Sequence, residues 1–366
     1  MKTLILLGGG HAHLAVLKQL QKGTPEGWRV QLLSPSKYQT YSGMLPGWIA
    51  GHYSLSDCQI DLQRLCQSAH VEFIIDQAAS IDADHCNVSL NSQATLTYDL
   101  LSIDIGGESD VSHLALAADK LIPIRPLDYF IQKWGEIVNQ LEQGRALRIA
   151  VVGGGAAGIE LALAMQYFRQ NLKLPLEIDF ICSSRGILPG FTQAVRGRAQ
   201  QAMLNNGIRQ HQAIAKGIEG GLLLSNGVRI AADFIVAAPG VRAPLCLSGS
   251  KLALNKRGFI ALNDAQQSIS HPNVFAAGDV GSRSVEHEKS GVHAVRAGPV
   301  LAKNLFDMMQ GRSSLVHYTP KRTTLYLLAT GPKHAIASWG NFSADGYWVW
   351  LWKRWIDLNF IKKCRN

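Results

Sequence analysis

The sequence predicts an α/β fold with two Rossmann-like dinucleotide-binding domains and a small C-terminal α+β element. Three observations favour this fold class: a glycine turn after an apolar run at residues 4–10, a second glycine turn at residues 149–160, and a tryptophan-rich helical pattern at residues 346–361. An apolar run, a tight glycine turn and a helical pattern, in that order, are typical of a βαβ unit that binds a dinucleotide.

The first glycine turn follows the apolar residues 4–7, which suit a parallel strand buried on both faces. Gly8, Gly9 and Gly10 form the turn, and a helical pattern follows from residue 14. We expect Gly8 to allow the sharp turn and Gly10, which has no Cβ, to let a diphosphate approach the backbone. The alternative is a glycine turn in another kind of α/β protein.

The helix after this turn would direct its free N–H groups, at His11 and Ala12, towards the phosphates. His13 stands where the G-x-G-x-x-G motif has its third glycine, at which helix and strand normally pack closely. The helix must therefore stand away from the strand, or the His13 ring must point elsewhere.

The second glycine turn follows an apolar run at residues 149–152 and is complete. Gly153, Gly155 and Gly158 match G-x-G-x-x-G, and Ala156 begins the helical pattern. Two such turns imply two nucleotides bound by two domains, which we interpret as FAD at the first turn and NADH or NADPH at the second. The alternative is one functional and one vestigial site.

Composition and charge limit the class of protein. The 366 residues are 47% hydrophobic and 17% charged, which fits a globular chain of two domains. The net charge of +9 could favour anionic cofactors, an anionic membrane surface or nucleic acid, but no nucleic-acid motif accompanies it. Six scattered cysteines without a CxxC pair predict neither a metal site nor a thioredoxin-type redox pair, and favour a cytoplasmic location.

The positions that would contact the nucleotide riboses lack the usual acid. Ser34 ends the second predicted strand of the first domain, and Lys37 lies close enough in sequence to assist with a phosphate or ribose. In the second domain Cys182 replaces the acid and Arg185 follows, which favours the 2′-phosphate of NADPH. A solvated surface arginine is the alternative.

Further candidate positions, in the first domain and where the chain returns to it from the second, are small residues and one acid near strand ends. Ala79 is small enough for contact with an adenine, and Gly106 and Gly240 end predicted strands. The strand at residues 274–276 ends in Gly278 and Asp279. The Asp279 carboxylate could accept hydrogen bonds from sugar-alcohol hydroxyls, cap a helix, or do both.

Residues 38–48 form an aromatic, glycine- and proline-containing loop that includes Ser42, Gly43 and Pro46. The loop is too apolar for a solvated linker, so it would either wall a flat ring or pack as ordinary core. Residues 290–307 predict a helix whose small Ala294, Ala297 and Gly298 could lie under a ring.

The C-terminal segment differs in kind from the two domains. Residues 325–337 predict two short strands, and residues 346–361 predict a helix with Trp348, Leu351, Trp352 and Trp355 on one face. Tryptophan beside lysine and arginine, including Lys353, is typical of an interfacial membrane helix. Docking on its own domain or on a second copy, as a homodimer, is the alternative.

These motifs together resemble the FAD-dependent pyridine nucleotide-disulfide oxidoreductase superfamily, near type II NAD(P)H dehydrogenases and quinone or sulfide:quinone reductases. They also look like the flavin domain found fused to selenide water dikinase in some bacteria. The resemblance rests on sequence segments along nearly the whole chain, at residues 8–14, 41–47, 151–160, 274–281, 291–305 and 352–360.

The resemblance implies roles for the motif residues. Gly8, Gly9 and Gly10 would bind the FAD diphosphate, Asp279 the ribityl chain, and the second turn the NAD(P)H diphosphate with Glu160 near the nicotinamide. The loop at 41–47 and residues 293–297, beginning with His293 and Ala294, would line the isoalloxazine. Ser34, Cys182 and Arg296 depart from the family pattern, and no redox-active cysteine pair lies near the flavin segments.

The domain hypothesis follows from these motifs. We expect the FAD-binding domain at residues 1–107 and 241–318, the NAD(P)H-binding domain at 108–240, and an interface or membrane-contact element at 319–366.

The functional hypothesis is an FAD-dependent NAD(P)H dehydrogenase. Hydride would pass from NAD(P)H to flavin, with a cation such as Lys289 or Arg296 stabilising the reduced ring. Electrons would then pass directly to a quinone. The protein would be cytoplasmic and could bind peripherally to the inner face of the membrane. The alternatives are a low-turnover flavoprotein serving selenium metabolism as an accessory or redox sensor, and a sulfide or disulfide oxidoreductase.

Overall fold

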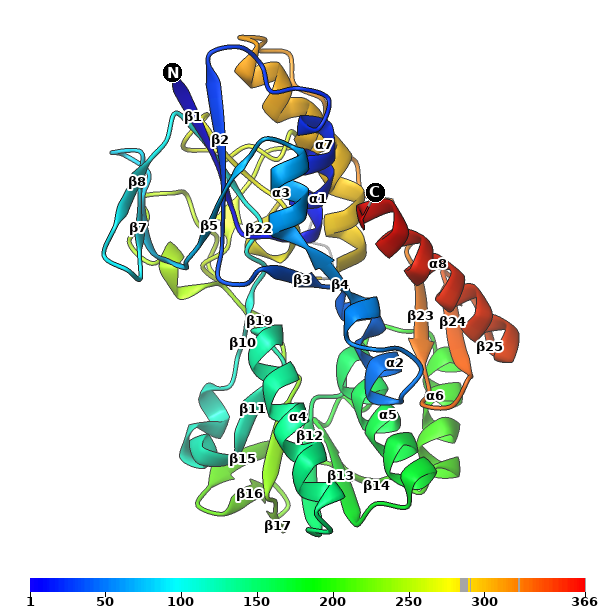
Figure 1. Cartoon of the computed structure of the whole chain (residues 1–366). Coiled ribbons are helices and arrows are strands. Elements are labelled where there is room, and N and C mark those ends of the chain that lie inside the picture. The colour runs from blue at the N-terminus through cyan, green and yellow to red at the C-terminus, as the bar shows by residue number, and fades with distance from the viewer. Residues whose placement is uncertain (284–288, 290, 322, 366) are drawn as a thin grey trace.

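Two parallel five-stranded sheets form the centres of two domains, one above the other in Figure 1. The computed structural model describes residues 1–283, 289, 291–321 and 323–365. The α/β fold with two Rossmann-like domains and a C-terminal α+β element is therefore confirmed.

The first sheet contains strands from both predicted segments of the FAD-binding domain. Its strand order is β21-β9-β1-β2-β5, and every pairing is parallel. These strands are β1 (Lys2–Leu7), β2 (Trp28–Ser34), β5 (Glu72–Ile75), β9 (Leu100–Ile103) and β21 (Val274–Ala276).

Helices cover one face of this sheet and a small antiparallel sheet covers the other. The helical face holds α1 (His11–Leu20), α3 (Leu62–Ser68) and α7 (Gly291–Met309), which bury Leu4, Leu6 and Leu32. On the opposite face β6 (Ala78–Asp82), β7 (Asn87–Leu90) and β8 (Thr95–Thr97) pack over Ile5 and Leu7. Because β1 is buried on both sides, its residues read as a continuous apolar run.

The second sheet has the order β11-β18-β12-β13-β14 and is also parallel throughout. Its strands are β11 (Leu121–Pro123), β12 (Leu147–Val152), β13 (Leu176–Cys182), β14 (Arg209–Gln212) and β18 (Phe234–Ala237). One face carries α4 (Leu127–Glu142), α5 (Ala156–Leu172) and α6 (Gln193–Asn205), and the other carries β15 (Ala215–Ile218), β16 (Gly221–Leu224) and β17 (Arg229–Ala231).

The chain crosses between the two sheets twice, and the crossings pair with each other. β10 (Glu108–Ser109) runs antiparallel to β19 (Val241–Arg242), and Arg242 Nη2 lies 2.9 Å from Glu108 Oε2. The two domains are therefore tied together by a short ladder and an ion pair.

The C-terminal element contains one strand more than the sequence predicts. β23 (Leu325–Ala329) and β24 (Ala335–Trp339) are joined by β25 (Phe342–Gly346), and α8 (Tyr347–Arg365) follows. The missed signal is the two-residue Gly340-Asn341 turn, in which Gly340 has a φ of +58° that suits a tight hairpin. Figure 1 shows α8 along one side of the molecule, from beside the first domain at its C-terminal end to the β23–β25 sheet at its start.

The segment predicted as an aromatic loop is more ordered than expected. After β3 (Tyr38–Thr40), which pairs with β4 (Gln59–Asp61), it forms a 3₁₀ turn at Ser42–Met44 and the short helix α2 (Leu45–Ile49). Its apolar side chains pack on α5 of the second domain, so this segment both lines the domain boundary and contributes to the core.

Candidate functional site

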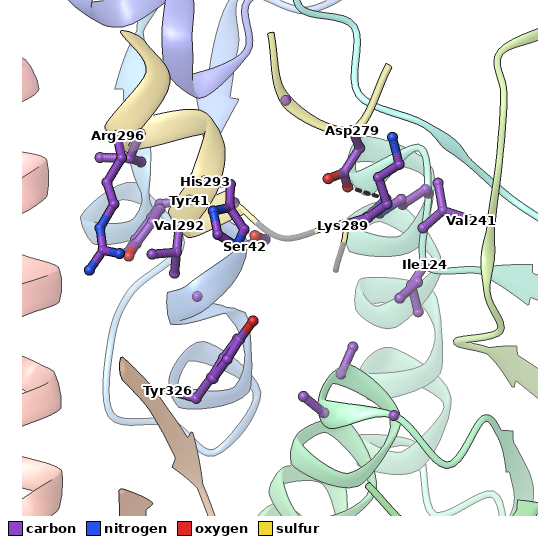
Figure 2. A pocket seen from close by; sticks show the side chains of 18 of the residues that line it. Tyr41, Ser42, Ile124, Val241, Asp279, Lys289, Val292, His293, Arg296 and Tyr326 are labelled. Carbon is purple, nitrogen blue, oxygen red and sulfur yellow. Dashed lines mark hydrogen bonds and ion pairs between the residues drawn. The ribbon is translucent and has the colours of Figure 1, made fainter. Parts of the chain in front are cut away.

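A cavity of about 1090 Å³ lies where the two domains and α8 meet. It is lined by the 42–46 segment, the second glycine turn, the Gly278–Asp279 turn, the start of α7 and the inner face of α8. Figure 2 shows Ser42 and His293 on one side of the pocket, Asp279 and Lys289 on the other, and Tyr326 below.

The second glycine turn has the geometry of a complete dinucleotide motif. A Cβ on Gly153 would lie 2.1 Å from the Ala238 carbonyl oxygen, and one on Gly158 would lie 2.0 Å from the Gly153 carbonyl oxygen. Gly155, by contrast, faces open space at the cavity, beside Ala156 at the start of α5. Two glycines therefore allow close packing, and the third leaves room for a ligand at the helix N-terminus.

The first glycine turn is built differently. Its glycines are required by protein neighbours: a Cβ on Gly8 would meet the Asp104 carbonyl oxygen at 2.5 Å, and one on Gly10 would meet the Asp104 carboxyl carbon at 2.3 Å. Gly9 likewise faces Leu62. The missing Cβ of Gly10 thus accommodates the Asp104 side chain, and the approach of a diphosphate to this turn stays a prediction.

His13 points into the domain and away from the cavity. Its ring is fully buried, with Nδ1 2.6 Å from the Gly8 carbonyl oxygen and Nε2 2.8 Å from Ser102 Oγ. Burial lowers the pKa of His13 to about 4, so the ring is neutral at neutral pH. Of the two alternatives left by the sequence, the ring pointing elsewhere is the one observed.

Asp279 is buried at the cavity and is held by an arginine of the other domain. Arg125 Nη1 donates to Asp279 Oδ2 at 2.8 Å, in an ion pair that joins the start of α4 to the Gly278–Val280 turn. Ala277, and not Asp279, is the residue before this turn, and no side chain caps it. Asp279 is thus free of a capping role, and Arg125 is a site residue that sequence reasoning missed.

The flavin-facing candidates divide into two groups. Ser42, Gly43, Pro46, His293 and Ala297 line the cavity, as does Gly240 from the second crossing. Ala294 is buried against Gly278, and Gly298 packs on Ala12 and Ala15 of α1, so neither is a cavity-lining residue in the described part of the chain. The small size of Gly298 serves contact between α1 and α7.

The two candidate cations both line the cavity. Lys289 Nζ lies 4.0 Å from the centre of the Phe259 ring and donates to the Gly281 carbonyl oxygen. Arg296 Nη1 is buried and has no hydrogen-bond partner among the described residues. Figure 2 shows Arg296 and Lys289 on opposite sides of the pocket, so they could act on different parts of a ligand.

Glu160 belongs to a buried charge cluster, which we define as Glu160, Tyr41, Lys353 and Asp357. Lys353 Nζ donates to Asp357 Oδ2 at 2.9 Å and to the Gly43 carbonyl oxygen at 2.8 Å, while Glu160 Oε1 accepts from the Ala329 N–H at 2.8 Å. Burial raises the pKa of Glu160 to about 7, against the opposing charge of Lys353. A carboxyl that titrates near neutral pH at a cavity wall can deliver a proton.

Lys353 therefore corrects one sequence interpretation. We expected it to contribute positive charge beside the tryptophans, but its side chain is only 12% exposed and faces the cavity. The missed signal is the Lys353–Asp357 spacing of one helical turn, which places the pair on the inner face of α8.

The remaining candidates lie outside the lining of this cavity. Ser34 is buried beside Gly9, Gly106 has a φ of +70°, and Ala79 and Arg185 are exposed. Lys37 forms an ion pair with Asp61 at 3.5 Å. Arg196 lies near Gly186, so a second arginine accompanies Arg185 at the end of β13.

The cysteines offer no redox pair at the site. All six are free thiols, and none lines the cavity. Burial raises the pKa of Cys58 and Cys66 to about 12 and of Cys246 to about 11, which keeps these thiols protonated and weakly nucleophilic.

Two buried nitrogen atoms and an open helix end fit polar cofactors. His11 Nε2 and Arg296 Nη1 are buried without partners among the described residues; Arg296 lines the cavity, whereas His11 and the first glycine turn lie outside its lining. Gly155 leaves open space on the cavity wall. Buried polar atoms without partners are rare in native proteins, so these atoms indicate a missing polar ligand.

Comparison with known proteins agrees with this geometry. A family model for pyridine nucleotide-disulphide oxidoreductases matches residues 2–298. The NADH dehydrogenase-like protein MT1860 of Mycobacterium tuberculosis is 27% identical over 265 residues, which cover 67% of this chain and 64% of that protein. A mitochondrial internal alternative NAD(P)H-ubiquinone oxidoreductase of Arabidopsis thaliana is 22% identical, over 84% of this chain and 67% of that protein.

Solved structures share the fold at low identity. NDH2 from Plasmodium falciparum, in complex with NADH, has a TM-score of 0.83 at 13% identity and covers 100% of this chain and 97% of its own. Sulfide:quinone oxidoreductase from Aquifex aeolicus has a TM-score of 0.80 at 19% identity, with 100% and 92% covered.

The chain belongs to the pyridine nucleotide-disulphide oxidoreductase family. Its cofactors are accordingly FAD and a pyridine nucleotide.

Proposed function

We propose that the protein is an FAD-dependent NAD(P)H dehydrogenase that reduces a quinone directly, without a disulfide. The observation that carries this proposal is a single cavity lined by the second glycine turn, the flavin-side residues and α8, with no cysteine on its wall. When bound, FAD would supply the hydride-accepting ring and then pass electrons on.

The chain's own residues would orient the two cofactors and protonate the electron acceptor. Gly155 and Ala156 leave the N-terminus of α5 open for the diphosphate of the pyridine nucleotide. Asp279, held by Arg125, would accept hydrogen bonds from the ribityl hydroxyls. Glu160, which lines the cavity, would give a proton to an acceptor that gains electrons.

Nucleotide preference follows from the end of β13. Arg185 is exposed and Arg196 lies nearby, while Cys182 offers no carboxylate for a ribose 2′-hydroxyl. These features support NADPH over NADH.

Contact with a membrane surface is proposed for the exposed aromatic stripe, which we define as Trp348, Leu351 and Trp355. Their exposed fractions are 52%, 43% and 65%, and Trp339 and Phe342 of the adjoining hairpin are also more than half exposed. No helix in the described part of the chain has the length and apolar character required to cross a bilayer. An aromatic stripe beside basic residues supports surface contact, at which a lipid-soluble quinone would enter.

The test is steady-state turnover of the holoprotein with NADH or NADPH against quinones of increasing tail length, with and without liposomes. We expect NADPH-dependent quinone reduction that liposomes increase. A protein that retains FAD but reduces no quinone with either nucleotide would contradict the proposal, and would favour the low-turnover accessory role.

A further inference from the structure

A buried carboxylate occupies the N-terminus of α1, where the first glycine turn should receive the FAD diphosphate. Asp104 Oδ2 accepts from the backbone N–H of Ala12 at 2.7 Å and of His13 at 3.1 Å. Asp104 is 3% exposed and follows β9 directly. Two of the donors that a phosphate would use therefore already bind an acid of the protein.

The surrounding glycines accommodate this carboxylate. A Cβ on Gly10 would lie 2.4 Å from Asp104 Oδ2, and a Cβ on Gly278 would lie 2.9 Å from Asp104 Oδ1. One glycine from each of the two FAD motifs thus faces Asp104. The close fit makes the acid a fixed part of the turn.

No cation in the described part of the chain forms an ion pair with Asp104. The nearby acid Asp279 is itself paired with Arg125 at 2.8 Å. His13 directs its ring at Gly8 and Ser102, and burial keeps both His11 and His13 neutral by lowering their pKa values to about 4. Among the described residues, the hydrogen bonds that would compensate a charged Asp104 come from two backbone N–H groups, those of Ala12 and His13.

Burial already raises the pKa of Asp104 to about 7 in the protein without ligand, although the N–H groups of His13 and Ala12 oppose the shift. A diphosphate at the same helix end would bring two further negative charges into a water-poor site. Like charges in such a site cannot all remain ionised.

We propose that Asp104 carries a proton whenever FAD is bound, so that FAD binding takes up one proton from solution wherever the unliganded protein holds Asp104 ionised. This inference rests on the proposed FAD site at the first glycine turn. The neutral acid could keep one oxygen for the helix N–H groups and turn its O–H towards a phosphate oxygen, so it would change from competitor to donor. FAD retention would then weaken as pH rises above neutrality.

The test is the dissociation constant of FAD from the refolded or stripped apoprotein between pH 6 and pH 9, measured by flavin fluorescence. The FAD dissociation constant of the wild type should not change with pH below pH ~7. Above pH ~7 it should rise by up to about tenfold per pH unit, as expected when binding is linked to one proton. Asp104→Asn keeps an acceptor oxygen and cannot ionise, so its constant should be flat throughout. Asp99→Asn is the matched control, because Asp99 also accepts a backbone N–H, from Thr3 at 2.7 Å, at the other end of β9.

Proton uptake in the wild type provides a measurement that needs no variant. Titration calorimetry of FAD binding at pH 8, in buffers of different ionisation enthalpy, should give close to one proton per FAD. FAD binding without proton uptake would overturn the inference, and so would a pH-dependent FAD dissociation constant in Asp104→Asn. Neither result would contradict the FAD site itself. Failure to bind FAD at any pH overturns the cofactor site itself and the inference with it.

Discussion

At the residue scale, several titratable side chains of the first domain are held in their neutral forms by burial. His13 shows the effect clearly, since it replaces a motif glycine yet is accommodated by hydrogen bonds to Gly8 and Ser102. The pKa of this buried ring is lowered to about 4 from 6.5, so the folded protein binds its proton less readily than the unfolded chain. The stabilising contribution is therefore complete above pH ~6.5 and lost as the pH falls towards 4.

We predict that the apoprotein loses about 3 kcal/mol of unfolding free energy between pH 7 and pH 4 through His13 alone. His13→Gln keeps a polar side chain without the titration, so its unfolding free energy should fall less over this range, as measured by urea unfolding. His113→Gln, at an exposed position, should follow the wild-type curve. Parallel curves for wild type and His13→Gln would sink this explanation.

The pKa of Glu160 is shifted in the opposite direction, upwards, and we expect this shift to affect the rate of the reaction. Burial raises the pKa of this carboxyl to about 7, and Lys353 is shared with the second buried acid Asp357. Two carboxylates and one ammonium would leave a net negative charge in the interior, so one acid tends to keep its proton near neutral pH.

We predict that Glu160→Gln slows acceptor reduction about 10²-fold, the usual size of a general-acid contribution, while NAD(P)H still reduces the flavin within a few-fold of the wild-type rate. Stopped-flow absorbance separates the two half-reactions. Glu142→Gln, on an exposed side chain of α4, serves as the control. Equal slowing of both half-reactions would show that Glu160 acts on nucleotide binding instead.

At the scale of elements, α1 and α7 pack closely because small residues meet. A Cβ on Gly298 would lie 2.9 Å from Ala15 Cβ and 3.0 Å from the Ala12 carbonyl oxygen. We predict that Gly298→Ala destabilises the protein by about 1–3 kcal/mol through overpacking. Gly197→Ala in α6 faces open space and should instead stabilise by about 0.5–1 kcal/mol. Thermal unfolding of both variants tests the two predictions. A Gly298→Ala variant more stable than the wild type would contradict the close contact between α1 and α7.

Helix α8 has two faces with separate roles. Its inner face buries Val349, Asp357 and Ile361 against the rest of the chain, and its outer face carries the exposed aromatic stripe. Docking on its own chain therefore holds for the inner face of this helix, and membrane contact of the exposed outer face stays a proposal.

We predict that the double change Trp348→Ser and Trp355→Ser weakens sedimentation with anionic vesicles at least tenfold, because two partly inserted indoles are lost. Tyr129→Ser removes an aromatic that is 38% exposed on α4 and should leave binding unchanged. Undiminished vesicle binding of the double variant would remove the stripe from the membrane proposal.

At the scale of the whole molecule, the sequence predicts local features and misses contacts between distant segments. The strands, the two glycine turns and the long helices follow from apolar periodicity and glycine spacing. Asp104 beside Gly10, Arg125 beside Asp279 and Lys353 near Glu160 join residues that are 94, 154 and 193 positions apart, and no local pattern marks them. Those contacts determine the charge state of the site.

The central claim is that electrons pass from a nicotinamide nucleotide to FAD and on to the acceptor without a sulfur relay. Anaerobic titration of the holoprotein with NADPH or NADH, followed by flavin absorbance, tests it most directly. The account predicts complete bleaching at one nucleotide per flavin, with no further uptake. A second equivalent consumed per flavin would reveal a redox disulfide, and failure of both nucleotides to bleach the flavin would contradict the account altogether.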